Sequence, residues 1–344
     1  MDYSRINKIL DEKFELSSDE EQFFKEAHQN PHLPVGVSPY YMELAKKDPS
    51  DPIRKQFVPS VKELNFLSYE SSDPLMEEKH HPLPRFIHRY PSRAIILTTD
   101  QCPTYCRHCF RRSFLGQSQG MITRYQTDQI AMYLASHKEV KEILITGGDP
   151  LMLSDPLLDY LLLKVKERRQ DIVFRISTRM PVVLPSRVTA RLVKILKKYS
   201  PLWFTVQFNH PRELTQESRD SIKLLIDSGI PIINQAVLLK GVNDNFVTLR
   251  DLYRGLVSCG IAAGYLLQPD LAIGTSHFRV SLDKGVGLTK ALRKEMSALS
   301  VPTYAVDMPD GGGRIPLTGD WEISGRWYIL HDALGRAFPY PLED

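Results

Sequence analysis

Three cysteines lie within one short stretch of the chain, Cys102-Pro-Thr-Tyr-Cys106-Arg-His-Cys109. They are three of the 4 cysteines among 344 residues, and they follow an apolar run at 94–97. Thiolates gathered in this way are usually metal ligands. Three thiolates suit a four-iron cluster whose fourth iron is open to a small molecule, since such clusters are held by cysteine thiolates. The spacing therefore favours a [4Fe-4S] cluster.

Two other uses of these cysteines stay open. A closed structural zinc site needs four nitrogen or sulfur ligands, so Cys259 or a histidine from elsewhere would have to complete it. A redox disulfide would join two of the three cysteines and leave the third unpaired.

The elements that position these residues follow a regular alternation from residue 94 onward. Six apolar runs predict strands, over 94–99, 142–146, 172–177, 202–208, 231–239 and 263–268. Helical periodicity predicts helices over 124–137, 155–168, 186–199, 212–228, 246–259 and 285–298. Near-continuous apolar strands indicate a parallel sheet that is buried on both faces, and helical crossovers between its strands close it into a barrel. We therefore predict an α/β fold with a partial (β/α)6-type barrel and an N-terminal helical extension.

The rest of the chain is expected to flank this barrel, which we place at residues 94–316. Residues 1–60 predict an N-terminal helical cap, and residues 61–93 predict an extended segment rich in proline and histidine. A C-terminal tail over 317–344 follows the barrel.

The composition is that of an ordinary globular protein, with 42% hydrophobic and 25% charged residues. A net charge of +3 is too balanced to indicate nucleic acid or an anionic membrane as a partner. The chain has no apolar run near the ~20 residues that span a bilayer, and its acidic N-terminus does not resemble a signal peptide. Without a disulfide framework, the cytoplasm is the expected compartment. The composition is equally compatible with a monomer and with a homo-oligomer.

In such a barrel, chemistry takes place at the carboxyl ends of the strands. Gly147 and Gly148 follow the second predicted strand and would let the backbone approach a ligand closely, with Asp149 as a hydrogen-bond acceptor beside it. An ordinary strand-to-helix turn is the alternative interpretation. Asp270 and Asp307 each end an apolar stretch, so both carboxylates are expected at the mouth of the barrel.

A confined carboxylate costs free energy unless a cation meets it. For Asp270 and Asp307 that cation is either an arginine of the protein or a cationic substrate. Arg111 follows the cysteines and suits a carboxylate or phosphate. The stretch Arg89-Tyr90-Pro91-Ser92-Arg93 is a second candidate anion site, with a solvated surface as the alternative.

With these motifs in order, the chain resembles the radical S-adenosyl-L-methionine (radical SAM) enzymes and, within them, the lysine 2,3-aminomutase family. The resemblance runs from about residue 73 to residue 316. It rests on the segments CPTYCRHCFRR, HRYPSR, LITGGDPL, STRMPVVLP, FNHPRE, NQAVLL, LLQPD, SHFRVSLDKG and VPTYAVDMPDGGG.

The resemblance implies a radical SAM barrel in which the three cysteines hold a [4Fe-4S] cluster. The open iron would bind S-adenosyl-L-methionine (SAM), and an external electron donor would drive its cleavage to a 5′-deoxyadenosyl radical. Gly147, Gly148, Asp149 and Gln235 would line the SAM site. A histidine commonly stands in the family where this chain has Gln207.

The resemblance also implies an isomerase that moves an amino group from C2 to C3 of lysine or a related amino acid. Arg111 would bind the substrate carboxylate, and Asp270 and Asp307 would meet its amino groups. These three residues are the expected catalytic set.

The second cofactor of the family is pyridoxal 5′-phosphate (PLP), whose phosphate Arg89, Tyr90 and Arg93 would hold. The family carries its PLP-bearing lysine directly after the glycine run, where this chain has Arg314. An arginine stays protonated and cannot form an imine, and the last lysine in the chain is Lys294. PLP is therefore not expected to be covalently bound at Arg314.

Three alternatives follow from this departure. PLP could bind noncovalently, it could be absent from an enzyme that acts on another substrate, or the protein could be a noncatalytic relative that binds PLP or an amino acid. The short stretch after Arg314 resembles the branch of the family that prepares β-lysine for modification of translation elongation factor P.

Overall fold

The computed structural model describes residues 3–27, 33–117 and 119–342, so residues 1–2 and 28–32 of the expected helical cap lie outside the described residues. Nine strands form one sheet whose spatial order follows the chain. Its members are β1 (Phe86–Tyr90), β2 (Arg93–Leu97), β3 (Glu142–Thr146), β4 (Val173–Thr178), β5 (Leu202–Val206), β6 (Ile232–Val237), β7 (Ala262–Leu267), β8 (Thr303–Met308) and β9 (Gly313–Pro316).

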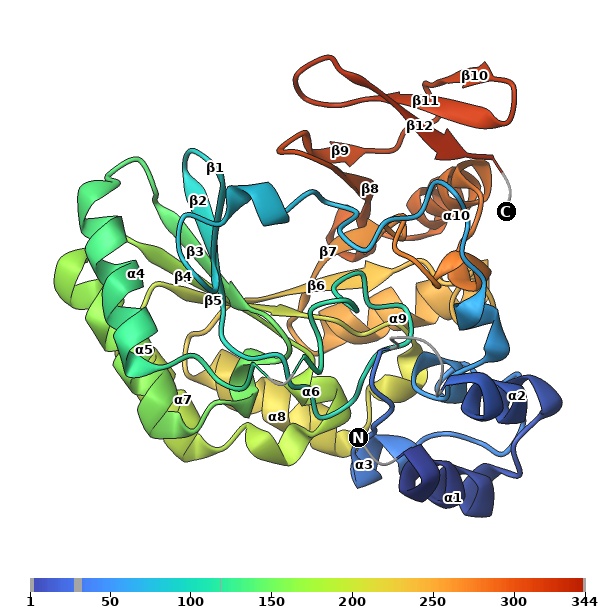
Figure 1. The fold of residues 1–344 in the computed structure, drawn as a ribbon, viewed down its shortest axis with the longest axis horizontal. Helices are drawn as coiled ribbons and strands as arrows, with labels where there is room; N and C mark the ends of the chain where they lie inside the picture. The colour runs from blue at the N-terminus through green and yellow to red at the C-terminus, as the bar shows by residue number, and fades with distance from the viewer. Residues whose placement is uncertain (1–2, 28–32, 118, 343–344) are drawn as a thin grey trace.

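The strands from β2 to β8 run parallel to one another, and β2 to β7 lie at the six predicted apolar runs. β8, which carries Asp307, is a seventh parallel strand beyond those predicted. In β3, the side chains of Ile143 and Ile145 are fully buried, whereas Leu144 faces the inside of the curled sheet. Figure 1 shows the sheet curling into an open half-barrel, with α4, α5, α7 and α8 over its outer face. The predicted α/β partial barrel is confirmed.

Six crossover helices join the parallel strands. They are α4 (Arg124–Ser136), α5 (Asp155–Arg168), α7 (Ala190–Lys197), α8 (Gln216–Asp227), α9 (Phe246–Ser258) and α10 (Leu282–Glu295). In α5, Leu158, Leu161, Leu162 and Val165 recur at helical spacing and are fully buried. Most of these helices begin at a side-chain cap, such as Thr123, whose hydroxyl accepts a hydrogen bond from the backbone N–H of Gln126. The cap and the apolar stripe together explain why each segment folds where it does.

Antiparallel strands close both edges of the sheet. β1 pairs with β2 and β9 pairs with β8, each through a tight turn. β1 lies in the segment that was expected to be only extended, because its proline- and histidine-rich sequence reads as a loop. β9 places Arg314 beside the carboxyl end of β8, whereas the turn between β1 and β2 lies next to Glu142, at the amino end of β3.

The two ends of the chain pack against the barrel. The helices α1 (Tyr3–Phe14), α2 (Ser18–Glu26) and α3 (Pro39–Glu43), together with α6 (Met180–Val183) after β4, complete the helical elements. The tail forms a second, antiparallel sheet of β10 (Glu322–Ser324), β11 (Trp327–His331) and β12 (Ala337–Pro341), near β8 and β9 in Figure 1. Its Tyr340 hydroxyl donates to the carbonyl of Pro269 at 2.9 Å, which ties the tail to the end of β7. No helix in the described part of the chain is both long and apolar enough to cross a membrane.

Candidate active site

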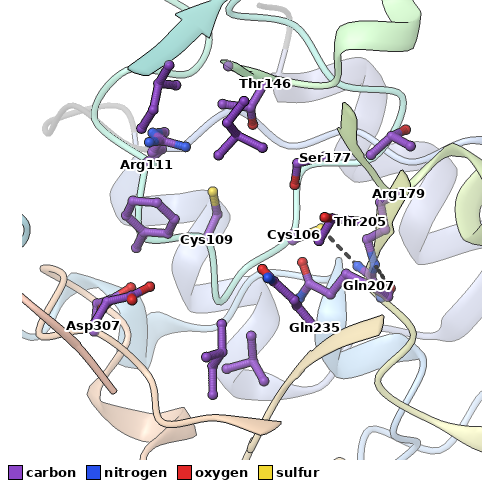
Figure 2. A pocket seen from close by; sticks show the side chains of 18 of the residues that line it. Cys106, Cys109, Arg111, Thr146, Ser177, Arg179, Thr205, Gln207, Gln235 and Asp307 are labelled. Atoms are coloured by element: carbon purple, nitrogen blue, oxygen red, sulfur yellow. Dashed lines mark hydrogen bonds between the residues drawn. The ribbon is translucent and has the colours of Figure 1, made fainter. Parts of the chain in front are cut away.

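One cavity of about 360 Å³ opens inside the curl of the sheet, toward the carboxyl ends of the parallel strands. Every site residue predicted from the sequence lines it, namely Cys102, Cys106, Cys109, Arg111, Gly147, Gly148, Asp149, Gln235, Asp270, Asp307, Arg89, Tyr90 and Arg93. Figure 2 shows Cys106, Cys109, Arg111, Gln235 and Asp307 arranged around this space.

The cysteine loop follows β2, and all three of its sulfurs are free thiols. Between them, Arg107 is fully buried and donates to Glu63 at 2.6 Å and to the carbonyl of Pro34 at 2.8 Å, which fixes the loop to the N-terminal segment. Burial raises the pKa of the Cys109 thiol to about 11 and that of Cys102 well above its usual value. Since thiolates are the ligands, binding of iron would release protons from these sulfurs.

In the described part of the chain, no group of three or more His, Cys, Asp or Glu side chains is placed to hold a single ion. In a four-iron cluster each thiolate binds a different iron atom, so its cysteines do not converge on one point. Three sulfurs that line one cavity fit such a cluster.

Gly147 and Gly148 bring the turn after β3 against the backbone that leads into the cysteine loop. Gly147 has a φ of 123°, and a Cβ there would lie 2.6 Å from the carbonyl oxygen of Thr99. A Cβ on Gly148 would lie 2.2 Å from the carbonyl oxygen of Gln101. The Gly148 N–H donates to the carbonyl oxygen of Thr99 at 2.6 Å. Both glycines are therefore required for this close backbone packing.

The Asp149 carboxylate organises the same turn. It accepts hydrogen bonds from the Thr178 hydroxyl at 2.7 Å and from the backbone N–H groups of Arg179 at 2.8 Å and Leu151 at 3.0 Å. Burial raises the pKa of this carboxyl group, and these hydrogen bonds oppose the shift. Both oxygens accept hydrogen bonds within the protein, so Asp149 holds this turn in place in the cavity wall.

Arg179, at the end of β4, contacts a cysteine sulfur. Its Nη1 donates to Sγ of Cys106 at 2.8 Å, as the dashed line in Figure 2 shows. Its Nη2 donates to the buried carboxylate of Glu213 at 2.8 Å and to the hydroxyl of Tyr41 at 3.1 Å. The sequence indicated no role for Arg179, because its partners come from segments far away in the chain.

Several polar atoms in the cavity wall are buried without a hydrogen-bond partner. They include Nε2 of Gln235, Oγ1 of Thr205, Nδ1 of His108, Nε of Arg89 and Oδ1 of Asp270. Gln207, which replaces the family's usual histidine, contacts His108 through the two Nε2 atoms at 2.9 Å. Buried polar groups are nearly always satisfied, so these atoms indicate polar ligands in this space.

Arg111 forms a two-bond ion pair with Glu77, through Nε at 3.1 Å and Nη2 at 2.6 Å. Both side chains are nearly buried, with 12% and 11% of their surface exposed. Among the described residues, the Nη1 atom of Arg111 has no hydrogen-bond partner, so the guanidinium keeps one edge for a ligand.

Asp307 and Arg314 lie directly opposite each other on β8 and β9. Arg314 donates to both oxygens of Asp307, through Nε and Nη2, at 2.8 Å each. The Arg314 guanidinium also lies 4.6 Å from the ring centroid of Tyr265. A protein arginine is therefore the counterion of Asp307 in this structure, which is the first of the two alternatives that the sequence left open.

Asp270 stays without such a partner. Its Oδ1 atom is buried and has no hydrogen-bond partner. Burial, together with the nearby charge of Asp307, raises the pKa of the Asp270 carboxyl group well above its usual value. The two carboxylates that the sequence treated as equivalent therefore differ in their surroundings.

The hairpin of β1 and β2 carries the predicted anion site. The guanidinium groups of Arg93 and Arg89 lie 4.0 Å and 4.9 Å from the ring centroid of Tyr90. Arg89 also donates to the carbonyl of Leu75 at 2.8 Å. All three predicted residues line the cavity, with Arg89 and Tyr90 partly buried and Arg93 exposed.

Comparison with known proteins agrees with this geometry. Residues 96–252 match the model of the Radical SAM superfamily. The L-lysine 2,3-aminomutase of Clostridium subterminale is 42% identical over 85% of this chain and 70% of its own length. A putative L-lysine 2,3-aminomutase of Aquifex aeolicus is 37% identical over 90% of this chain and 85% of its own. A glutamate 2,3-aminomutase of Clostridioides difficile is 35% identical over 96% of this chain and 77% of its own length.

Among solved structures, Streptococcus suis SuiB bound to S-adenosylmethionine has a TM-score of 0.50 and 15% identity, over 72% of this chain and 56% of that chain, which supports the fold alone. The half-barrel and its cysteine loop define a radical SAM enzyme that uses a [4Fe-4S] cluster and SAM. More narrowly, the chain belongs to the lysine 2,3-aminomutase family and is an enzyme of the aminomutase type.

The family's PLP does not fit this cavity in its covalent form. The residue after the glycine run is Arg314, and no lysine is among the described residues that line the cavity. An imine between PLP and the protein therefore has no amine within this site.

Proposed function

We propose that this enzyme moves the amino group of lysine, or of an amino acid with a similar cationic side chain, between C2 and C3. One observation carries the proposal, which is that the three cysteines, Arg111 and Asp270 line the same cavity. Relatives named lysine 2,3-aminomutase and glutamate 2,3-aminomutase support an amino acid as the substrate class. Neither a noncatalytic binding protein nor a radical enzyme for another substrate class is favoured.

In this proposal Cys102, Cys106 and Cys109 would hold the cluster, which would pass one electron from an external donor to SAM. Arg179 keeps Cys106 in place through the hydrogen bond to its sulfur. The unpaired amide of Gln235 is available to hydrogen-bond SAM.

The substrate is held at its two charged ends. The free edge of Arg111 binds the carboxylate, and the pair with Glu77 fixes the direction of the guanidinium. Asp270 binds the distal ammonium group, since it is the buried carboxylate with an unpaired oxygen.

Arg89, Tyr90 and Arg93 form a preorganised anion site that suits the phosphate of PLP. We propose that PLP binds there without a bond to the protein. The cytoplasm is the compartment that we propose, since the cluster needs its cysteines reduced.

The test is an anaerobic assay with the reconstituted enzyme, dithionite, SAM, PLP and lysine, read out for 5′-deoxyadenosine and β-lysine. Cys106→Ala should abolish both products. Cys259→Ala is the matched control and should keep both, because Cys259 lies outside the cavity next to Arg219. A fully loaded cluster that releases no 5′-deoxyadenosine would contradict the proposed activity.

A further inference from the structure

Arg314 pairs with both carboxylate oxygens of Asp307, so the negative charge of Asp307 is not free for a ligand in the cavity. The pair is bidentate, and 24% and 21% of the two side-chain surfaces are exposed. A guanidinium matches the geometry of a carboxylate through two parallel bonds, which a single ammonium group cannot do. A substrate ammonium would therefore have to displace a better partner to reach Asp307.

Arg314 has little freedom to leave this pair. It lies directly across from Asp307 in the register of β8 and β9, and its guanidinium also lies over the Tyr265 ring. Since an arginine stays charged at ordinary pH, Arg314 keeps a positive charge beside Asp307.

Asp270 lines the same cavity, but unlike Asp307 it forms no ion pair with an arginine among the described residues. Its Oδ1 is buried without a partner, and no hydrogen bond between Asp270 and Arg314 is found among the described residues. A buried carboxylate oxygen of this kind is costly unless a ligand satisfies it.

Building on the proposed function, we infer that Arg314 is a specificity-determining residue that withdraws Asp307 from substrate binding and leaves Asp270 as the single carboxylate for the substrate. The ligand class is then an α-amino acid whose side chain ends in one cationic group. An acidic side chain would meet the unpaired Asp270 carboxylate, and a neutral one would leave it unsatisfied.

The experiment measures equilibrium binding of lysine, norleucine and glutamate by calorimetry. It uses the enzyme with its cluster reconstituted and SAM bound, without a reductant, so that nothing turns over. Norleucine has the same carbon chain as lysine but lacks the ammonium group. The ratio of the lysine and norleucine affinities therefore reports the contact with the ammonium group alone.

We expect lysine to bind about 30-fold or more tightly than norleucine, and glutamate not to bind. Asp270→Asn should remove this preference for lysine. The neutralised pair Asp307→Asn/Arg314→Met should keep it within about threefold, and Arg314→Met alone should strengthen it, because Asp307 then becomes free.

Loss of the preference in the Asp307→Asn/Arg314→Met variant would overturn the inference, because Asp307 would then bind the substrate despite Arg314. An unchanged preference in Arg314→Met or in Asp270→Asn would overturn it as well. If Asp270→Asn does not fold, the wild type and Arg314→Met still decide between these outcomes. Failure of the proposed function appears separately, as an enzyme that prefers lysine but forms no 5′-deoxyadenosine.

Discussion

Arg314 and Asp307 form a cross-strand ion pair with two bonds of 2.8 Å at the edge of the catalytic cavity. In the lysine 2,3-aminomutase family the position of Arg314 carries the lysine that bears PLP. One substitution therefore has two effects, since it removes the amine that could attach a cofactor and supplies a counterion to a neighbouring carboxylate.

The first prediction concerns Arg314→Lys. This change supplies a primary amine inside the cavity, so we expect PLP to form an imine with the variant and not with the wild type. Borohydride reduction followed by peptide mapping should find a pyridoxyl group on residue 314 of the variant alone. Arg336→Lys is the matched control, because Arg336 pairs with Asp332 outside the cavity. A pyridoxyl-lysine in the wild type would contradict our account of PLP.

The second prediction concerns the turn after β3. Gly148→Ala should destabilise the protein by about 1–3 kcal/mol and lower its iron content, because the added Cβ meets the backbone of Gln101 at 2.2 Å. Denaturant unfolding and iron analysis measure the two effects. The control is Gly287→Ala in α10, where a Cβ meets nothing within 4 Å. Equal stability of the two variants would contradict the proposed packing role.

The third prediction concerns Arg179, the residue next to the Cys106 sulfur. Arg179→Gln should shift the cluster potential to a more negative value, since a hydrogen bond to a ligand sulfur stabilises the reduced cluster. It should also cost about 3–5 kcal/mol of stability, because the buried Glu213 carboxylate loses the arginine that balances its charge. Redox titration followed by electron paramagnetic resonance measures the potential.

Arg219→Gln is the matched control for this prediction. Arg219 also donates to a cysteine sulfur at 2.8 Å, but that sulfur belongs to Cys259, outside the cavity. A potential unchanged in Arg179→Gln, or shifted equally in both variants, would refute the role of Arg179.

The fourth prediction concerns pH. Burial and the charge of Asp307 raise the pKa of Asp270 in the folded enzyme above its usual value of 3.8. The folded state therefore binds more protons than the unfolded state between these two pKa values, so stability falls as pH rises through this range. Asp270→Asn should remove this slope, as urea unfolding across pH would measure. A slope unchanged in the variant would show that another group causes it.

Most of the barrel was predictable from the sequence because each strand is a continuous apolar run, and the structure places β3 at the predicted residues Glu142–Thr146. The cysteines, the Gly147–Asp149 turn, Asp270 and Asp307 were found because parallel strands bring their carboxyl ends together, whatever their separation in the chain. Arg89, Tyr90 and Arg93 lie at the other end of β2, and their spacing in the sequence pointed to them instead. The hairpin strand β1 was missed, since its polar residues and flanking prolines read as a loop.

The contacts between site residues could not be predicted in the same way. The pairing of Arg314 with Asp307 depends on the register of β8 and β9, which the glycine turn between them sets. The contact of Arg179 with Cys106 depends on Glu213 and Tyr41, which come from separate segments. Residue types and strand ends were therefore visible in the sequence, whereas the partners of each charge were not.

The most direct test of the central claim is the release of 5′-deoxyadenosine and β-lysine by the anaerobically reconstituted wild-type enzyme supplied with dithionite, SAM, PLP and lysine. Our account predicts that both products form and that Cys106→Ala forms neither. A wild-type enzyme with a complete cluster that releases no 5′-deoxyadenosine would contradict it.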